Sequence, residues 1–178
     1  SGIGRACAER LSRAGAAVTV LDLQGDAARE IAEGLGGEAM QADLSDYEVL
    51  NGLEVDADIV VNNAGLQYVA PVEEFPPDRF SMILRIMLEA PFRIVQKALP
   101  GMYEQGWGRV INISSIHGMV ASPYKSAYIS AKHGLEGLSK VIALEGAPHG
   151  VTSNCVNPAY VRTPLVENQI ADQAKAHG

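Results

Sequence analysis

The chain has 178 residues, of which 47% are hydrophobic and 20% are charged, so it is long enough for one domain with a sizeable core. Its formal net charge of −7 argues against nucleic acid as a partner and is explained most simply by solubility. The two cysteines, Cys7 and Cys155, lack a metal-binding spacing, and no apolar run reaches the roughly 20 residues of a membrane-spanning helix. We therefore expect a cytoplasmic protein that binds neither a metal, nor nucleic acid, nor a membrane.

Short apolar runs alternate with longer amphipathic stretches along the chain. The runs predict buried strands and the stretches predict helices, because the two differ in hydrophobic period. The predicted strands are Ala17–Leu21, Glu38–Gln41, Asp58–Asn62, Arg109–Ile113 and Thr152–Asn157. The predicted helices are Ile3–Ala14, Asp26–Leu35, Phe80–Met102 and Tyr124–Ala147. This alternation predicts an α/β fold in one domain, with a parallel sheet covered by helices on both faces.

Two of these segments carry local signals. Pro91 and Pro100 interrupt the helix predicted over Phe80–Met102. The segment between Asp43 and Asp58 is short for a full crossover helix, and we expect Ser45 to cap a helix of a few turns there.

A glycine-rich turn and a carboxylate suggest a dinucleotide site. Ser1-Gly2-Ile3-Gly4 leads directly into a helical pattern, where a helix N-terminus can bind a pyrophosphate. Asp22 ends a predicted strand about 20 residues later, where dinucleotide-binding folds place the acid that binds the ribose. A carboxylate there would repel a 2′-phosphate, which favours NAD over NADP. The alternatives are a plain helix start and a solvated turn aspartate.

Four local signatures together resemble the short-chain dehydrogenase/reductase family. Ser1-Gly2-Ile3-Gly4 resembles the end of its glycine motif, and Asn62-Asn63-Ala64-Gly65 matches its Asn-Asn-Ala-Gly. Ser115 followed by Tyr128-Ile129-Ser130-Ala131-Lys132 matches its Ser and Tyr-x-x-x-Lys, and Asn157-Pro158-Ala159 resembles its Asn-Pro-Gly. The order and spacing agree over essentially the whole chain.

The resemblance implies a Rossmann-type, doubly wound parallel sheet. Residues 1–178 would form a partial domain that lacks the first strand and the C-terminal strands and would not be a stable enzyme alone. The helices over Met82–Leu99 and Tyr128–Leu144 would bind other subunits, as in a homotetramer. The residues that the resemblance assigns to NAD are Gly2, Ile3, Gly4, Asp22, Asp43, Asn62, Ala64, Gly65, Tyr128, Lys132, Val161 and Thr163.

The resemblance also implies the catalytic chemistry. Tyr128 and Lys132, four residues apart, lie on one helix face. A nearby ammonium and an oxidised nicotinamide would lower the pKa of Tyr128, which then takes the substrate's hydroxyl proton. Ser115 would bind the reacting oxygen. Taken singly, Tyr128 is equally an amphipathic core tyrosine, and Lys132 a solvated charge on a helix.

Two residues depart from the family pattern. Met87 stands where the family often has an Asn that binds a proton-relaying water, and a thioether is a poor hydrogen-bond partner. The relay would then use a backbone carbonyl or Glu89, or be weaker. Ala159 replaces Gly and adds one methyl group beside the cofactor.

Four polar residues near these motifs resemble the carboxylate-binding set of 3-hydroxybutyrate dehydrogenases, beside Ser115 and Tyr128. They are Gln67, His117, Lys125 and Gln169. A lysine with neutral donors around it would fix the carboxylate of a short 3-hydroxy acid, so the resemblance implies (R)-3-hydroxybutyrate as substrate and acetoacetate as product. The alternatives are a turn residue for Gln67, a surface histidine, a solvated lysine and an exposed helix residue for Gln169.

Two other functions remain open on the sequence. One is a dehydrogenase or reductase of another small alcohol or of an acetoacetyl thioester, against which Asp22 and the carboxylate set argue. The other is a protein that senses NAD without catalysis, against which Ser115, Tyr128 and Lys132 argue.

Overall fold

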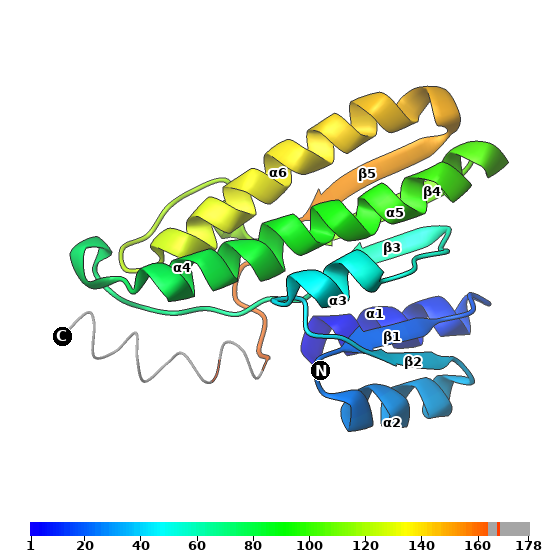
Figure 1. The fold of residues 1–178 in the computed structure, drawn as a ribbon, viewed down its shortest axis with the longest axis horizontal. Helices are drawn as coiled ribbons and strands as arrows, with labels where there is room; N and C mark the ends of the chain where they lie inside the picture. The colour runs from blue at the N-terminus through cyan, green and yellow to red at the C-terminus, as the bar shows by residue number, and fades with distance from the viewer. Residues whose placement is uncertain (164–166, 168–178) are drawn as a thin grey trace.

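Five strands form two parallel sheets in the computed structural model, which describes residues 1–163 and residue 167 (Figure 1). β1 (Thr19–Asp22) pairs with β2 (Glu38–Gln41). β4 (Gly108–Ile113) lies between β3 (Ile59–Asn62) and β5 (Val151–Val156). The parallel α/β fold predicted from the sequence is confirmed, and each strand lies within two residues of its predicted bounds.

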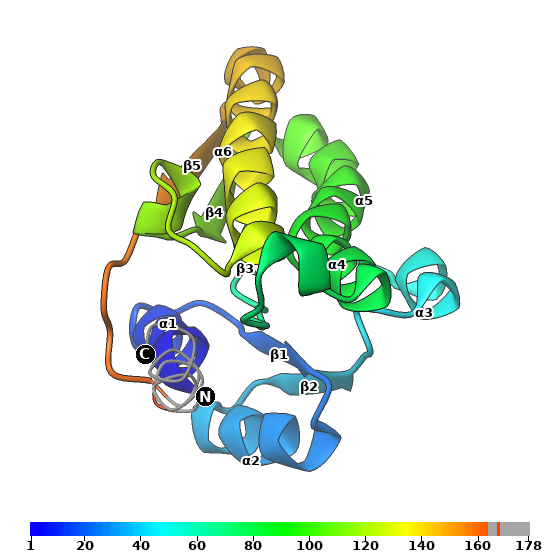
Figure 2. The ribbon, with the colours of Figure 1, turned by 90° about the vertical axis from the view of Figure 1, so that its left-hand side faces the viewer.

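The helices cover these sheets. α5 (Ala90–Gln105) and α6 (Ser126–Gly146) pack on the three-stranded sheet, whereas α2 (Gly25–Leu35) packs on β1 and β2 (Figure 2). α1 (Gly2–Arg13) runs beside the β1–β2 pair. In the part of the chain that the structure describes, no helix is long and apolar enough to cross a membrane.

The long helix predicted before β4 is divided. α4 (Pro77–Leu84) leads into a π-helical segment, Arg85–Glu89, and α5 follows, with Pro91 in its first turn. Proline lacks an N–H group and is tolerated in the first turn of a helix. The π-helical segment is wider than an α-helix, and such segments are common at functional sites. Here it carries Met87 into the core beside α6.

The short helix after β2 begins one residue later than predicted, and the predicted cap is wrong. The side chain of Asp46 accepts hydrogen bonds from the backbone N–H groups of Glu48 and Val49 at the start of α3 (Tyr47–Gly52). Ser45 instead donates its hydroxyl to Asp43. Aspartate is as good a cap as serine, and the sequence places both candidates side by side.

Two apolar clusters form the core. The first lies between the three-stranded sheet and α5 and α6, and the second lies where α4 and the π-helical segment cross α6. The first cluster contains Val60, Val95, Ala98, Met102, Val110, Ile142 and Val151. The second contains Phe75, Ile83, Met87, Ala127 and Ala131.

A chain of buried polar side chains crosses the three-stranded sheet. Asn62 donates to Asn112 at 2.8 Å, and Asn112 donates to Ser153 at 3.4 Å. Ser153 is bonded in turn to Ser139 of α6, at 2.8 Å. Buried polar groups of this kind are costly when they lose a partner, so the chain fixes the register of β3, β4 and β5 and the position of α6.

We expect Asn112→Ala to lower the free energy of unfolding by about 2 kcal/mol, because Asn62 would keep a buried donor without an acceptor. Urea unfolding of the purified full-length protein measures this value. Asn154→Ala is the matched control, since Asn154 is exposed on β5 and should change the stability by less than about 0.5 kcal/mol. Equal losses in the two variants would contradict a structural role for the polar chain.

Candidate active site

The carboxyl ends of β3, β4 and β5 meet at one edge because the three strands are parallel and in register. Asn62 lies opposite Asn112, and Ile113 lies opposite Val156. The loops that leave β4 and β5 are joined by two backbone hydrogen bonds, from Ser114 to Val156 at 2.8 Å and from Ile116 to Pro158 at 3.0 Å. The predicted motifs that follow these strands therefore converge at this edge.

Ser115, Tyr128 and Lys132 come together there. The side chain of Ser115 lies near enough to the hydroxyl of Tyr128 to lower its pKa. The ammonium of Lys132 lies 5.6 Å from the centre of the Tyr128 ring and donates to the carbonyl of Ile113 at 2.5 Å. Lys132 is only 5% exposed, so the alternative of a solvated lysine is wrong.

Burial changes the pKa values of this group. It lowers the pKa of the Lys132 ammonium to about 8, against the smaller opposing effects of Cys155 and Glu136. Burial also raises the pKa of Tyr128, and the nearby side chain of Ser115 offsets only part of that rise. The sequence analysis expected a lowered pKa for Tyr128 from the nearby ammonium and an oxidised nicotinamide. In the protein alone the cost of burying a phenolate outweighs the ammonium.

Met87 and Glu89, the two residues considered for the proton relay, lie in different surroundings. Met87 is 1% exposed, and its methyl group would lie 3.7 Å from a Cβ placed on Gly65, at the end of the β3 loop. Glu89 accepts hydrogen bonds from Arg93 at 2.9 Å and from the hydroxyl of Tyr47 at 3.2 Å. Its carboxylate therefore belongs to a cluster with α3, away from Tyr128.

Lys125 is buried at the start of α6. It is 6% exposed, and its ammonium makes no hydrogen bond or ion pair with any residue that the structure describes. The alternative of a solvated lysine is therefore wrong for this residue too. Burial lowers its pKa, because a charged amine loses its hydration there. The N-terminus of α6 adds positive potential at the same place, so the site favours an anion.

His117 and Gln67 lie near Lys125. The ring of His117 meets the ring of Tyr128 edge-on, 6.1 Å between centres, and its Nε2 atom lies 2.9 Å from the hydroxyl of Ser122. Burial, and then the charge of Lys125, lower the pKa of His117. The loop that carries Gln67 is joined to the Lys125 loop by a hydrogen bond from Ala70 N–H to the Tyr124 carbonyl. The amide nitrogen of Gln67 is buried and has no partner among the described residues, which do not include Gln169.

A backbone constraint places Lys125. Tyr124 has φ of +67°, in the left-handed region that side-chain-bearing residues seldom adopt. This turn directs the chain from the loop into α6 immediately before Lys125. This conformation could not be predicted from the residue type, since such turns usually contain glycine or asparagine.

The glycine turn fits a pyrophosphate. α1 begins at Gly2, which has φ of +53°, and its first turn holds no acidic residue. The N–H groups of that first turn lack helical acceptors, as at every helix start. A Cβ on Gly4 would lie 2.5 Å from the side-chain nitrogen of Asn63, and a Cβ on Gly2 would lie 3.2 Å from Thr163. Three segments assigned to the cofactor thus meet here, with glycine required by the close approach.

The other residues assigned to the cofactor lie at the neighbouring strand ends. Asp22 ends β1 and accepts a hydrogen bond from the N–H of Gln24 at 3.0 Å. Asp43 follows β2, and two hydrogen bonds from Ser45 lower the pKa of its carboxyl group. Ala64, Gly65 and Val161 are exposed, and Ile3 is partly buried in the first turn of α1.

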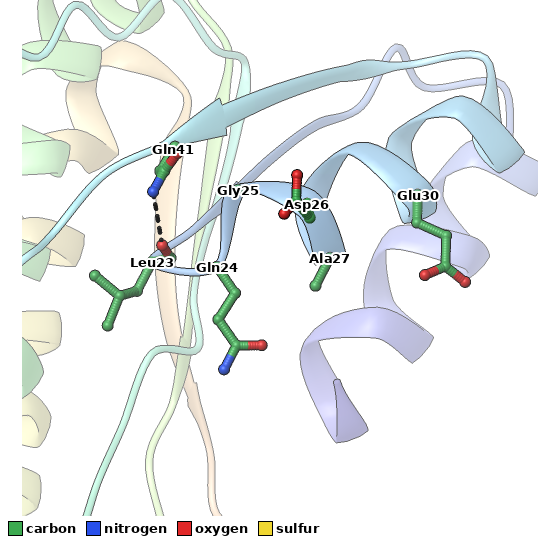
Figure 3. Close-up of a pocket in the computed structure, with 7 residues that line it drawn as sticks. All are labelled: Leu23, Gln24, Gly25, Asp26, Ala27, Glu30 and Gln41. Carbon is green, nitrogen blue, oxygen red and sulfur yellow. Dashed lines mark hydrogen bonds between the residues drawn. The ribbon is translucent and has the colours of Figure 1, made fainter.

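A pocket opens beyond Asp22, at the carboxyl ends of β1 and β2 (Figure 3). Gln41 donates to the carbonyl of Leu23 across it, and Asp26 and Glu30 project from α2 on the other side. Within the described part of the chain, its lining contains no lysine or arginine. Gln41, Asp26 and Glu30 were not predicted as site residues, although the four-residue spacing of the two acids on α2 indicates a common helix face.

The whole chain resembles known dehydrogenases. A family model described as short chain dehydrogenase matches residues 1–174. The chain is 43% identical to a D-beta-hydroxybutyrate dehydrogenase of Rhizobium meliloti, over 100% of this chain and 74% of that protein. It is 46% identical to an uncharacterized oxidoreductase of Bacillus subtilis, over 98% of this chain and 72% of that protein.

Solved structures agree with this result. The fold matches a gluconate 5-dehydrogenase of Burkholderia cenocepacia, solved in complex with NADP and tartrate, with a TM-score of 0.86. The two are 29% identical, and the match covers 98% of this chain and 73% of the other. With the motifs gathered at one sheet edge and a family match over nearly its full length, the chain belongs to the short chain dehydrogenase family of oxidoreductases.

Proposed function

We propose that this protein is an NAD-dependent dehydrogenase of short 3-hydroxy acids, which oxidises (R)-3-hydroxybutyrate to acetoacetate. The observation that carries the proposal is Lys125, a residue only 6% exposed, whose ammonium forms no ion pair with any residue that the structure describes. An unpaired buried charge is costly, and a substrate carboxylate would supply the missing partner. The 43% identity to a D-beta-hydroxybutyrate dehydrogenase supports the same substrate.

The proposed roles follow from the geometry around Lys125. Lys125 binds the carboxylate, with the buried amide of Gln67 and the ring of His117 nearby as further donors. Gln169, outside the described residues, is proposed as the fourth member of this set. A short acid held at Lys125 has its hydroxyl group directed towards Tyr128, whose ring contacts His117. Fixing one end of a small substrate in this way orients the reacting carbon.

Proton transfer is assigned to Ser115, Tyr128 and Lys132. Ser115 and Tyr128 bind the hydroxyl oxygen, and Tyr128 as phenolate takes its proton while the carbon loses hydride and becomes a ketone. When bound, the oxidised nicotinamide would supply the hydride acceptor, and its positive charge would favour the phenolate before the transfer. Lys132 would stabilise the phenolate and is held in place by its hydrogen bond to the Ile113 carbonyl.

The residues around the proposed adenosine ribose favour NAD over NADP. Asp22 is placed to accept hydrogen bonds from the ribose hydroxyls, and the pocket beyond it presents the carboxylates of Asp26 and Glu30. Asp26 is paired with Arg29, so the carboxylates of Asp22 and Glu30 remain to repel a 2′-phosphate. The proposed preference for NAD therefore rests on these two acids, one from β1 and one from α2.

The outer faces of α5 and α6 support an oligomer. Phe92, Val141 and Leu144 are exposed there, Leu144 by 77%. Apolar side chains gathered on helices at the surface favour contact with another chain. We propose that these helices bind further copies of the protein, as in a homotetramer.

The first assay follows NADH absorbance with the purified full-length protein. We expect turnover with (R)-3-hydroxybutyrate and NAD, and little with the S enantiomer or with NADP. Tyr128→Phe is the control, since it should abolish turnover but leave NAD binding in place. NAD binding without turnover of any 3-hydroxy acid would contradict the substrate assignment. If Tyr128→Phe also left every NAD-dependent function of the protein unchanged, the protein would be a sensor of NAD and not an enzyme.

Replacing Lys125 tests the carboxylate site. Lys125→Met should lower kcat/KM for the hydroxy acid roughly 10- to 100-fold, because a charge-assisted hydrogen bond is lost, and should leave the KM for NAD unchanged. Lys140→Met is the matched control, because Lys140 is exposed on the same helix. A neutral alcohol that the enzyme accepts should lose no activity through Lys125→Met.

The pKa of Lys125 adds a pH test. Because burial lowers this pKa, the ammonium loses its charge at a pH below the ordinary lysine range of about 10.4. The KM for the acid should therefore rise as the pH increases through that lowered value. Lys125→Arg keeps its charge at all these pH values and should remove the rise. A pH-independent KM in the wild-type protein would argue against Lys125 as the carboxylate ligand.

Asp22 is tested through the choice of cofactor. Asp22→Asn should lower the ratio of kcat/KM with NAD to that with NADP by about 10-fold, since it removes a charged acceptor for the ribose and a repulsion of the phosphate. Steady-state kinetics with both cofactors measure the ratio. The control, Asp56→Asn, changes an exposed carboxylate elsewhere and should leave the ratio as it is.

A further inference from the structure

Glu136 lies on α6, one turn after Lys132, and joins two loops of the site. The side-chain nitrogen of Asn157 donates to the Glu136 carboxylate at 2.5 Å and to the carbonyl of Ser115 at 3.0 Å. Asn157 follows β5, whereas Ser115 follows β4. The Glu136 carboxylate therefore holds, through one amide, the backbone of the residue whose side chain lies near the hydroxyl of Tyr128.

Glu136 also contacts the turn that follows Ser115. A Cβ placed on Gly118 would lie 2.9 Å from the Glu136 carboxylate and 2.6 Å from the hydroxyl of Ser114. A larger residue would displace the Glu136 side chain, so the 3₁₀ turn Ile116–Gly118 lies directly against Glu136. The same turn carries His117, whose backbone N–H donates to the Ser115 hydroxyl at 3.2 Å.

The carboxylate is held in its charged form. Burial is the largest single influence and acts to raise the pKa of Glu136, but the neighbouring polar side chains of Ser114, Asn157 and Cys155, with the charge of Lys140, together lower it. The charge acts on the neighbouring Lys132 and partly offsets the effect of burial on the pKa of that ammonium. The other groups that face Lys132 are Tyr128 on its own helix, Cys155 on β5 and the Ile113 carbonyl on β4.

We propose that Glu136 is a positioning residue of the reaction, which fixes Ser115 through Asn157 and Gly118 and places a carboxylate one helical turn from Lys132. It touches neither substrate nor cofactor and acts through these neighbours. The inference rests on the proposed roles of Ser115, Tyr128 and Lys132, but not on which alcohol is the substrate.

Glu136→Gln is the decisive variant, because it keeps the size and removes the charge. Glu145→Gln, an exposed acid on the same helix, is its control. A ¹³Cε-lysine NMR titration of the full-length protein follows Lys132, whose signal is assigned with Lys132→Arg. We expect the Lys132 midpoint to be lower in Glu136→Gln than in the wild-type protein and unchanged in Glu145→Gln.

Kinetics and hydrogen exchange supply two more readouts. With less charge on Lys132 the phenolate of Tyr128 is less stable, so the acidic limb of kcat for alcohol oxidation should move to higher pH in Glu136→Gln, with the KM for NAD unchanged. Backbone hydrogen exchange should become faster over residues 114–119. Glu136→Asp keeps the charge but is too short for Asn157, so it should speed the exchange while leaving the Lys132 midpoint close to wild type.

The outcomes separate the two proposals. If the wild-type protein turns over no 3-hydroxy acid, the substrate assignment fails, and the NMR titration and the exchange rates still test Glu136. If Glu136→Gln matches Glu145→Gln in the Lys132 midpoint and in exchange over residues 114–119, the positioning role is overturned, whatever the substrate. If only the hydrogen-exchange rates change, Glu136 has a structural role, and the effect of its charge on Lys132 is overturned.

Discussion

The ammonium of Lys132 donates a 2.5 Å hydrogen bond to the carbonyl of Ile113, the last residue of β4. A buried charge of this kind must be paired, so the bond fixes α6 at one height along the sheet. Tyr128, one turn earlier on the helix, is thereby held beside Ser115, which leaves the same strand two residues further on. The arrangement of Ser115, Tyr128 and Lys132 depends on this connection between a helix and a strand end.

The polar chain across the sheet also holds α6 against the strands, through the bond between Ser139 and Ser153. Asn62, Asn112, Ser153 and Ser139 are bonded in sequence from β3 to α6 and run just behind the strand ends. Side chains in the apolar clusters pack on both sides of this chain, but they do not set register, because apolar contact has no direction. The buried hydrogen bonds and the parallel strand pairing together bring the loops after β4 and β5 close enough to form hydrogen bonds with one another.

Much of this arrangement could be predicted from the sequence, where the signal is local. Strand runs, the four-residue spacing of Tyr128 and Lys132, and the glycines before α1 follow from short-range pattern. The π-helical segment around Met87 could not be predicted, because packing against α6 and not propensity decides it. Neither could the burial of Lys125, which depends on an unusual turn at Tyr124, nor the raised pKa of Tyr128, which depends on neighbours distant in the sequence.

The two sheets share no ladder hydrogen bond in the described part of the chain, and they divide the proposed ligands between them. Asp22 and the acidic pocket belong to the β1–β2 unit, whereas Lys125, His117 and Tyr128 belong to the loops and helix of the three-stranded unit. The proposed cofactor acids and the proposed substrate residues thus lie on different segments of the chain. A substitution at one set leaves the side chains of the other set in place, so preferences for cofactor and for substrate can be changed one at a time.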